Sequence, residues 1–189
     1  SGSSNGLTDN STLLVEGNTF LRCSNGVLMK RNFKRTRVAF NHFEGCRNDW
    51  GTAATVFDGS TGDGQLAGSV GIAIGNIHTD TVACCIDLRD TFTWHVEDIT
   101  DGTFGQDKDG VQMSNASVVK LDNADGCHIR FTYAGTSTDP SHSAVRIQNG
   151  SIDNRVTGVV RGTIAYGLLE TNGQNNTVDL KLGTGVGAA

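Results

Sequence analysis

The sequence predicts an all-β protein built from a stack of short strands, and three observations indicate this fold class. The 189 residues include 25 glycines and one proline, a composition that suits many tight turns with positive φ rather than a helical bundle. Apolar and polar residues alternate in short runs, the pattern of strands with one buried face. Because these runs recur along the chain, the sequence indicates a solenoid of similar coils.

The recurring unit contains three short strands. Its first strand is expected at 86–88, 111–113, 145–147 and around Leu168, in steps of 25, 34 and 23 residues. Second strands are expected at 94–99, 118–121, 154–157 and 176–182, and third strands at 127–131 and 159–164. The longest step contains an insertion, residues 132–143, and insertions in a solenoid form loops that often line a binding face.

Asparagine and glycine mark the corners between these strands. Asparagine tolerates the left-handed conformation that a sharp corner requires, and stacked asparagines can hydrogen-bond from coil to coil. The corner asparagines are Asn115, Asn123, Asn149, Asn154, Asn172, Asn175 and Asn176. Together with the recurring strands, they resemble the pectin-lyase-like superfamily from about Val70 to Leu182. The resemblance implies a right-handed, single-stranded parallel β-helix.

One domain with two parts is expected. Residues 1–69 should form irregular coils with a loop projecting at about 46–69, and residues 70–189 should form the regular coils. No amphipathic helix is visible to cover the open coils at either end, and an uncovered β-helix would expose its sheet edges. We therefore expect a fragment of a longer chain, whose other domains or partner subunits cover these ends.

Charge and cysteine content disfavour several classes of function. The net charge of −5 gives no indication of nucleic-acid binding, and no apolar run is long enough for membrane insertion. The five cysteines are odd in number and lack CxxC spacing, which predicts free buried thiols and synthesis in a reducing cytoplasm. No histidine has metal-binding spacing, so no metal site or other cofactor is predicted. Calcium binding by acidic clusters stays open, although no calcium-loop pattern is present.

Acidic residues are concentrated between positions 87 and 109. Neighbouring coils spaced about 4.8 Å apart would separate equivalent carboxylates by roughly 5 Å, or roughly 10 Å across two coils. These values bracket the separations in retaining and inverting glycosidases. We take Asp98, Asp107 and Asp109 as candidate catalytic residues. The alternative is that they are solvated turn and surface positions of an acidic protein.

Two segments carry a more specific resemblance. The run 107–111 (DKDGV), followed by 117–119 (SVV), is similar to the "NTDG" segment of polygalacturonase-like glycoside hydrolases. Residues 145–147 (VRI) resemble the "RIK" strand of that family. The resemblance implies that Asp109 is a catalytic carboxylate and that Arg146 binds substrate. Gln112 stands where the family usually has another acid, and the paired "DD" and "GHG" segments are absent.

Candidate sugar-binding residues lie in or beside the expected loops. Trp50 and Tyr133 are large amphipathic aromatics on which sugar rings could stack, and Asp58 lies in the same expected loop as Trp50. A basic cluster at 30–37 is either a solvated face or a contact for an anionic polysaccharide, because guanidinium groups bind carboxylates bidentately.

Irregular coils, Gly/Thr/Asn-rich corners, reduced cysteines and missing caps together resemble bacteriophage tailspike and tail-fibre receptor-binding proteins. The resemblance implies a homotrimer on the virion, made in the bacterial cytoplasm, that binds and depolymerises bacterial surface polysaccharide (O-antigen, capsule or exopolysaccharide). The enzyme would be a glycoside hydrolase or a polysaccharide lyase. Two alternatives stay open: a non-enzymatic glycan-binding or structural module of a tail fibre, and a secreted extracellular enzyme similar to polygalacturonases and pectate lyases.

Overall fold

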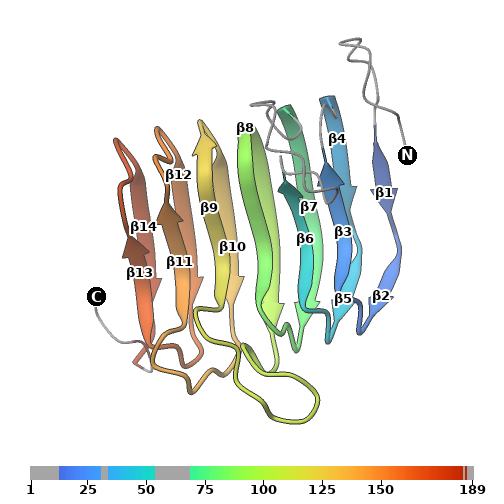
Figure 1. The fold of residues 1–189 in the computed structure, drawn as a ribbon, viewed down its shortest axis with the longest axis vertical. Helices are drawn as coiled ribbons and strands as arrows, with labels where there is room; N and C mark the ends of the chain where they lie inside the picture. The colour runs from blue at the N-terminus through green and yellow to red at the C-terminus, as the bar shows by residue number, and fades with distance from the viewer. Residues whose placement is uncertain (1–12, 31–33, 54–68, 185, 187–189) are drawn as a thin grey trace, which may run out of the picture.

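The computed structural model describes residues 13–30, 34–53, 69–184 and 186 (Figure 1). Within these ranges the chain forms fourteen strands and no helix, so the prediction of an all-β fold is confirmed. The described residues contain no helix with the length and apolarity needed to cross a membrane.

The strands succeed one another in similar groups. The first six are β1 (Leu14–Glu16), β2 (Thr19–Leu21), β3 (Asn25–Lys30), β4 (Lys34–Ala39), β5 (His42–Glu44) and β6 (Asn48–Ala53). Two long strands follow, β7 (Ser69–Thr79) and β8 (Cys84–Asp101). The last six are β9 (Ser117–Asp125), β10 (His128–Tyr133), β11 (Ser143–Gln148), β12 (Arg155–Val160), β13 (Tyr166–Glu170) and β14 (Thr177–Leu182).

The strands pair in parallel and lie in two layers. One layer contains β3, β6, β9, β11 and β13, and the other contains β1, β4, β7, β10, β12 and β14 (Figure 1). Strand β8 belongs to both, because its first part pairs with β6 and β9 and its last part pairs with β7 and β10. Each strand therefore pairs with the equivalent strand one turn of the chain away, and we call each such turn a coil.

The core lies between the two layers and consists of columns of side chains that repeat from coil to coil. One layer contributes the in-register column Val27, Trp50, Ile86, Val119, Val145 and Leu168. The other contributes Val15, Val38, Ala73, Val96, Ile129, Val156 and Val178. The central members are fully buried, and each buried aliphatic side chain contributes about 1.5–3 kcal/mol to stability. The two-residue alternation in the sequence thus encodes the inward face.

Polar side chains also stack along the coils. The backbone N–H groups of Asn18, Asn41 and Asn76 donate to the side-chain Oδ1 of Asn41, Asn76 and Asp98 respectively, at 3.0–3.1 Å. The steps between these residues are 23, 35 and 22 residues. This ladder ends at Asp98, because the next coil places Phe131 in register with it. A second ladder joins Asn154 to Asn176, so the predicted coil-to-coil asparagine bonds are confirmed.

Two kinds of corner let the coils close and stack. Left-handed corners are occupied by five of the predicted asparagines, Asn115, Asn123, Asn149, Asn172 and Asn175. A column of glycines, Gly102, Gly135 and Gly162, sits where backbone passes very close to backbone. A Cβ atom at Gly135 would lie 2.8 Å from the carbonyl oxygen of Gly102, and one at Gly162 would overlap the carbonyl oxygen of Gly135. At Gly135 and Gly162 glycine is required by this close approach, whereas Gly102 has a φ of +75°, the left-handed conformation that favours glycine.

Several predicted strands form where expected, and some do not. The runs at 127–131, 145–147, 154–157 and 176–182 correspond to β10, β11, β12 and β14. Those at 86–88 and 94–99 merge into the single strand β8. Residues 111–113 lie in a loop with Val111 exposed, so the strand expected there is wrong, and β9 begins only at Ser117. The loop expected from Cys46 is also wrong for residues 48–53, which form β6.

The prediction of buried thiols is confirmed for four of the five cysteines. All five cysteines are free, and only Cys23 is partly accessible.

Candidate functional site

A cleft of about 310 Å³ lies where the turns that follow β2, β5, β7 and β8 stack on one another. We call it the corner cleft, and it is lined by Arg22, Glu44, Gly45, Asp80, Val82, Thr103, Gln106, Asp107 and Lys108. The turns stack because parallel backbone hydrogen bonds continue beyond the strands. The Arg22 N–H donates to the Glu44 carbonyl at 2.8 Å, and the Gly45 N–H donates to the Thr79 carbonyl at 2.9 Å.

The carboxylates of the corner cleft come from neighbouring coils. Glu44 ends β5 and lies in register with Thr79, which directly precedes Asp80. The Oδ1 atom of Asp80 accepts the backbone N–H of Thr103 at 2.7 Å, which attaches the next turn to this side chain. The stacking of coils therefore brings together charges that are far apart in the sequence.

The structure separates the two aspartates of the DKDGV segment. Asp107 lines the corner cleft, and its Oδ1 accepts the backbone N–H groups of Asp109 and Val111, both at 2.9 Å. Asp109 points to solvent with 65% of its side chain exposed and pairs with Lys108 at 2.5 Å. Asp107 is thus held by its own turn at the edge of the cleft, whereas Asp109 is not among the lining residues.

Two of the other predicted site residues are buried in the core. Asp98 is 2% exposed and Trp50 is fully buried, and the indole Nε1–H of Trp50 donates to Asp98 Oδ2 at 3.0 Å. Trp50 also packs against Trp94, with the ring centroids 5.4 Å apart. The expectation that Trp50 offers its ring to a sugar is corrected, because the ring points from β6 into the core between the two layers. Asp98 likewise has no contact with solvent that a polysaccharide could reach.

Tyr133 is also fully buried, so its predicted stacking on a sugar ring is corrected as well. Its hydroxyl donates to the Thr163 carbonyl at 3.1 Å, and burial, with the charge of Cys85, raises its pKa. The reason for the error is the same as for Trp50. A polar-tipped aromatic beside a loop can equally occupy an inward strand position, and here Tyr133 is the last residue of β10.

Arg146 lies on β11, in register with Lys120 and away from the residues that line the corner cleft. It is half-buried; its Nε donates to Ser117 Oγ at 3.0 Å and its Nη2 donates to the Ser141 carbonyl at 3.1 Å. Partial burial lowers its pKa.

Asp58 lies outside the described residues, as do residues 31–33 of the basic cluster. Arg37 of that cluster pairs with Glu16 at 2.6 Å.

The insertion fixes the loop that carries Asp107 but does not contribute to the lining of the corner cleft. His142 is fully buried, with its Nδ1 hydrogen-bonded to Ser137 Oγ at 2.6 Å and its Nε2 to the Met113 carbonyl. Gly105 leaves the space for this imidazole, because a Cβ at Gly105 would overlap the ring. His142 therefore joins the insertion to the loop after β8, together with the hydrogen bonds Gln112–Thr138 and Asn115–Ser141.

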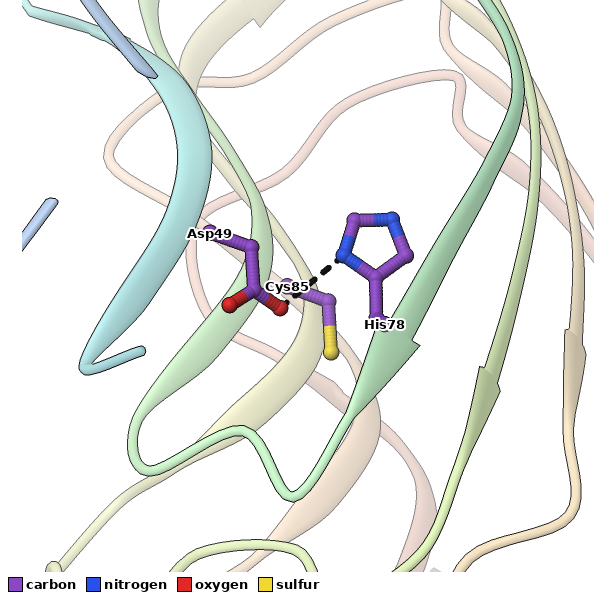
Figure 2. Close-up of side chains that lie close together, drawn as sticks. All are labelled: Asp49, His78 and Cys85. Carbon is purple, nitrogen blue, oxygen red and sulfur yellow. Dashed lines mark hydrogen bonds and ion pairs between the residues drawn. The ribbon is translucent and has the colours of Figure 1, made fainter. Parts of the chain in front are cut away.

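A buried polar cluster lies further inside. Asp49 on β6, His78 on β7 and Cys85 on β8 place one potential ligand atom each within 4.8 Å of one another, and this group could hold a metal ion (Figure 2). Asp49 Oδ2 contacts His78 Nδ1 at 2.9 Å and accepts the Thr81 hydroxyl at 2.5 Å. His78 Nε2 contacts Asp98 Oδ2 at 3.3 Å.

Two carboxylates set the charge state of this cluster. Burial alone would lower the pKa of His78, but the hydrogen bonds and charges of Asp49 and Asp98 outweigh it and raise that pKa to about 9. Burial pushes the pKa of Asp49 upward, and hydrogen bonds from His78, Thr81 and Cys85 oppose it. Burial, together with the charge of Asp49, also raises the pKa of the Cys85 thiol. The two neighbouring carboxylates therefore favour the charged form of the imidazole, against the effect of burial.

Sequence reasoning could not find this cluster from spacing. His78 follows Asp49 by 29 residues, and the three residues match no metal-binding pattern. One weak signal was present: His78 occupies an inward position of an alternating strand, where its ring stacks on Phe43 with centroids 5.3 Å apart. An inward histidine in a strand needs a buried polar partner.

Comparison of the chain with protein-family models, with curated protein sequences and with solved structures finds no match.

Proposed function

We propose that the chain is a right-handed parallel β-helix module of the tailspike type, which binds bacterial surface polysaccharide in the corner cleft. The observation that carries the proposal is the convergence of three carboxylates and two cations from successive turns on one open cleft. In-register parallel pairing of every coil with the next supports the β-helix part of the proposal.

The chemistry of the corner cleft suits a carbohydrate. Sugar hydroxyls are hydrogen-bonded by carboxylates such as Glu44, Asp80 and Asp107, and acidic sugars are bound by cations such as Arg22 and Lys108. The volume of about 310 Å³ is at the lower end of ligand sites, which run from about 300 to 1,000 Å³. An open cleft of this size fits a short stretch of a chain that continues in both directions.

The same carboxylates support depolymerisation as the second step of the proposal. Glu44 and Asp80 belong to neighbouring coils, and backbones in adjacent coils are about 4.8 Å apart. A pair of carboxylates at roughly 5–10 Å is what acid–base cleavage of a glycosidic bond requires. Of the residues predicted to be catalytic, Asp107 keeps this role in the proposal, and Glu44 and Asp80 join it.

The binding test uses a panel of purified O-antigens, capsular polysaccharides and exopolysaccharides, with affinity measured by calorimetry. Asp107→Asn keeps the oxygen that accepts the turn's N–H groups but removes the charge, and it is expected to weaken binding about tenfold or more. Glu44→Gln and Arg22→Ala are expected to weaken it similarly. Asp179→Asn is the matched control, because it removes the charge of an exposed aspartate on β14 that does not line the cleft.

Failure of every panel member to bind, or equal losses of affinity in Asp107→Asn and Asp179→Asn, would refute the proposed site. Depolymerisation is measured separately, by size-exclusion chromatography of each bound polysaccharide after incubation. Shortening that is lost in Glu44→Gln or Asp107→Asn supports an enzyme. Binding without shortening supports the alternative of a non-enzymatic tail-fibre module.

The remaining parts of the proposal concern assembly and location. A tailspike module is expected to be a homotrimer within a longer virion protein, its open coils covered by other domains. Sedimentation of the full-length chain as a monomer would contradict the trimer and favour a secreted enzyme instead.

A further inference from the structure

The buried cluster around His78 has the composition of a metal site rather than of a simple ion pair. Asp49, His78 and Cys85 offer an oxygen, a nitrogen and a sulfur, all within 4.8 Å of one another and all buried (Figure 2). Mixed O, N and S ligands are typical of zinc, whereas calcium and magnesium require oxygen ligands alone. The donor set therefore selects the class of ion.

The surroundings of His78 match the way proteins orient a metal-bound imidazole. Its Nδ1 faces Asp49 Oδ2, and its Nε2 lies 3.3 Å from Asp98 Oδ2. A ligand histidine almost always donates its other ring N–H to a carboxylate or a carbonyl. Asp98 is itself held by the Trp50 indole at 3.0 Å and by the Asn76 side chain at 3.0 Å. The second carboxylate is thus fixed by the core and by the end of the asparagine ladder.

One atom of the cluster has no partner. Asp49 Oδ1 is fully buried and makes no hydrogen bond within the described residues. An unsatisfied buried oxygen costs about 1–3 kcal/mol, so proteins seldom leave one in place. Rotation of the carboxylate toward an ion would give this oxygen a partner.

Charge balance favours a divalent cation. A dication bound by the Asp49 carboxylate, the Cys85 thiolate and neutral His78 leaves the three ligands and the ion with no net charge. The Asp98 carboxylate beside His78 adds one negative charge, which the hydrogen bonds from Trp50 and Asn76 stabilise, so the ion neutralises the buried carboxylate and thiolate that bind it.

We propose that Asp49, His78 and Cys85 bind one zinc ion per chain. Because the ligands come from β6, β7 and β8, the ion ties three strands from successive coils together inside the fold. Its role is structural, since the site is closed to solvent and none of its three ligands lines the corner cleft. The inference is independent of polysaccharide binding.

The test uses the full chain, depleted of metal with a chelator and then titrated with Co²⁺ as a spectroscopic probe. One equivalent of cobalt is expected to produce visible d–d bands and a thiolate-to-cobalt charge-transfer band, and one equivalent of Zn²⁺ is expected to remove both. Zn²⁺ should raise Tm, whereas Mg²⁺ should not.

Cys85→Ser is expected to abolish the charge-transfer band and the zinc-dependent rise in Tm. The matched control is Cys84→Ser, because the neighbouring thiol is equally buried but bonds the Ile86 carbonyl and is not part of the cluster. Sulfur and nitrogen neighbours of the ion are measured on the wild-type protein by X-ray absorption, so the test does not depend on the variants folding.

Three results would overturn the proposal. They are a folded protein that takes up no zinc or cobalt, a cobalt spectrum without thiolate charge transfer, and a charge-transfer band that survives in Cys85→Ser.

Discussion

Gly162→Ala is expected to destabilise the protein by about 3 kcal/mol or more, because the new methyl group would overlap the backbone of the preceding coil. The obstructing atom is the carbonyl oxygen of Gly135, which cannot rotate away as a side chain would. That carbonyl also accepts the Thr163 N–H at 3.1 Å, so a shift that relieves the overlap breaks a hydrogen bond between coils. Urea unfolding followed by tryptophan fluorescence measures the change, since Trp50 and Trp94 are both buried.

Gly167→Ala is the control for this prediction. Gly167 lies in β13, five residues further along, and the nearest atoms to an added Cβ belong to the partly exposed side chain of Leu182, at 3.2 Å. That side chain can move, so a change of about 1 kcal/mol or less is expected. Equal stability losses in the two variants would show that close backbone approach at Gly162 is not what limits stacking.

Asp98→Ala is expected to destabilise the protein by about 3–5 kcal/mol, measured by the same unfolding experiment with a chelator present. The substitution removes the acceptor of the Trp50 indole and of the Asn76 amide. It also removes one of the two carboxylates that flank His78. Three buried polar groups would lose a partner at once, and each such loss costs about 1–3 kcal/mol.

Two further variants separate the loss of buried hydrogen bonds from the loss of a carboxylate charge. Asp101→Ala lies on the same strand and removes a carboxylate that accepts the Thr79 hydroxyl at an exposed position, so a loss of about 1 kcal/mol or less is expected. Asp98→Asn keeps one oxygen but removes the charge beside His78, and its loss should fall between those of the two alanine variants. A loss of stability in Asp98→Ala as small as that in Asp101→Ala would contradict the prediction and show that the asparagine ladder is stable without Asp98.

Much of the strand pattern could be read from the chain, and the exceptions have physical causes. The runs that became β10 and β14 alternate over at least five residues with branched or aromatic side chains inward. Residues 111–113 alternate too, but they lie in a loop, because the Asp107 side chain accepts the N–H groups of Asp109 and Val111 and so stabilises a turn there. The glycine- and threonine-rich neighbours of Trp50 predict a loop, but these residues form β6, where the buried Trp50 ring packs on Trp94.

The site was only partly predictable. Asp107 is one of the three carboxylates that the acidic stretch suggests, and it lines the corner cleft, whereas Asp109, which the family resemblance favours, does not. The other cleft residues Glu44, Asp80 and Arg22 carry no motif, since they belong to other turns of the chain. The resemblance implies that Arg146 shares a site with Asp109, yet the structure places Arg146 on β11, in register with Lys120, and neither residue lines the corner cleft.

The sequence by itself determined that the protein is all-β, which face of most strands points inward, and where asparagine turns the corners. These features are local, because the alternation of a strand and the left-handed backbone of a corner each depend on only a few neighbouring residues. Only the tertiary structure decided which distant residues meet. The coils differ in length, with steps of 23, 35 and 22 residues along a single ladder, so no fixed period reveals which side chains share a position. For this reason the corner cleft and the cluster of Asp49, His78 and Cys85 emerge only once the coils are stacked.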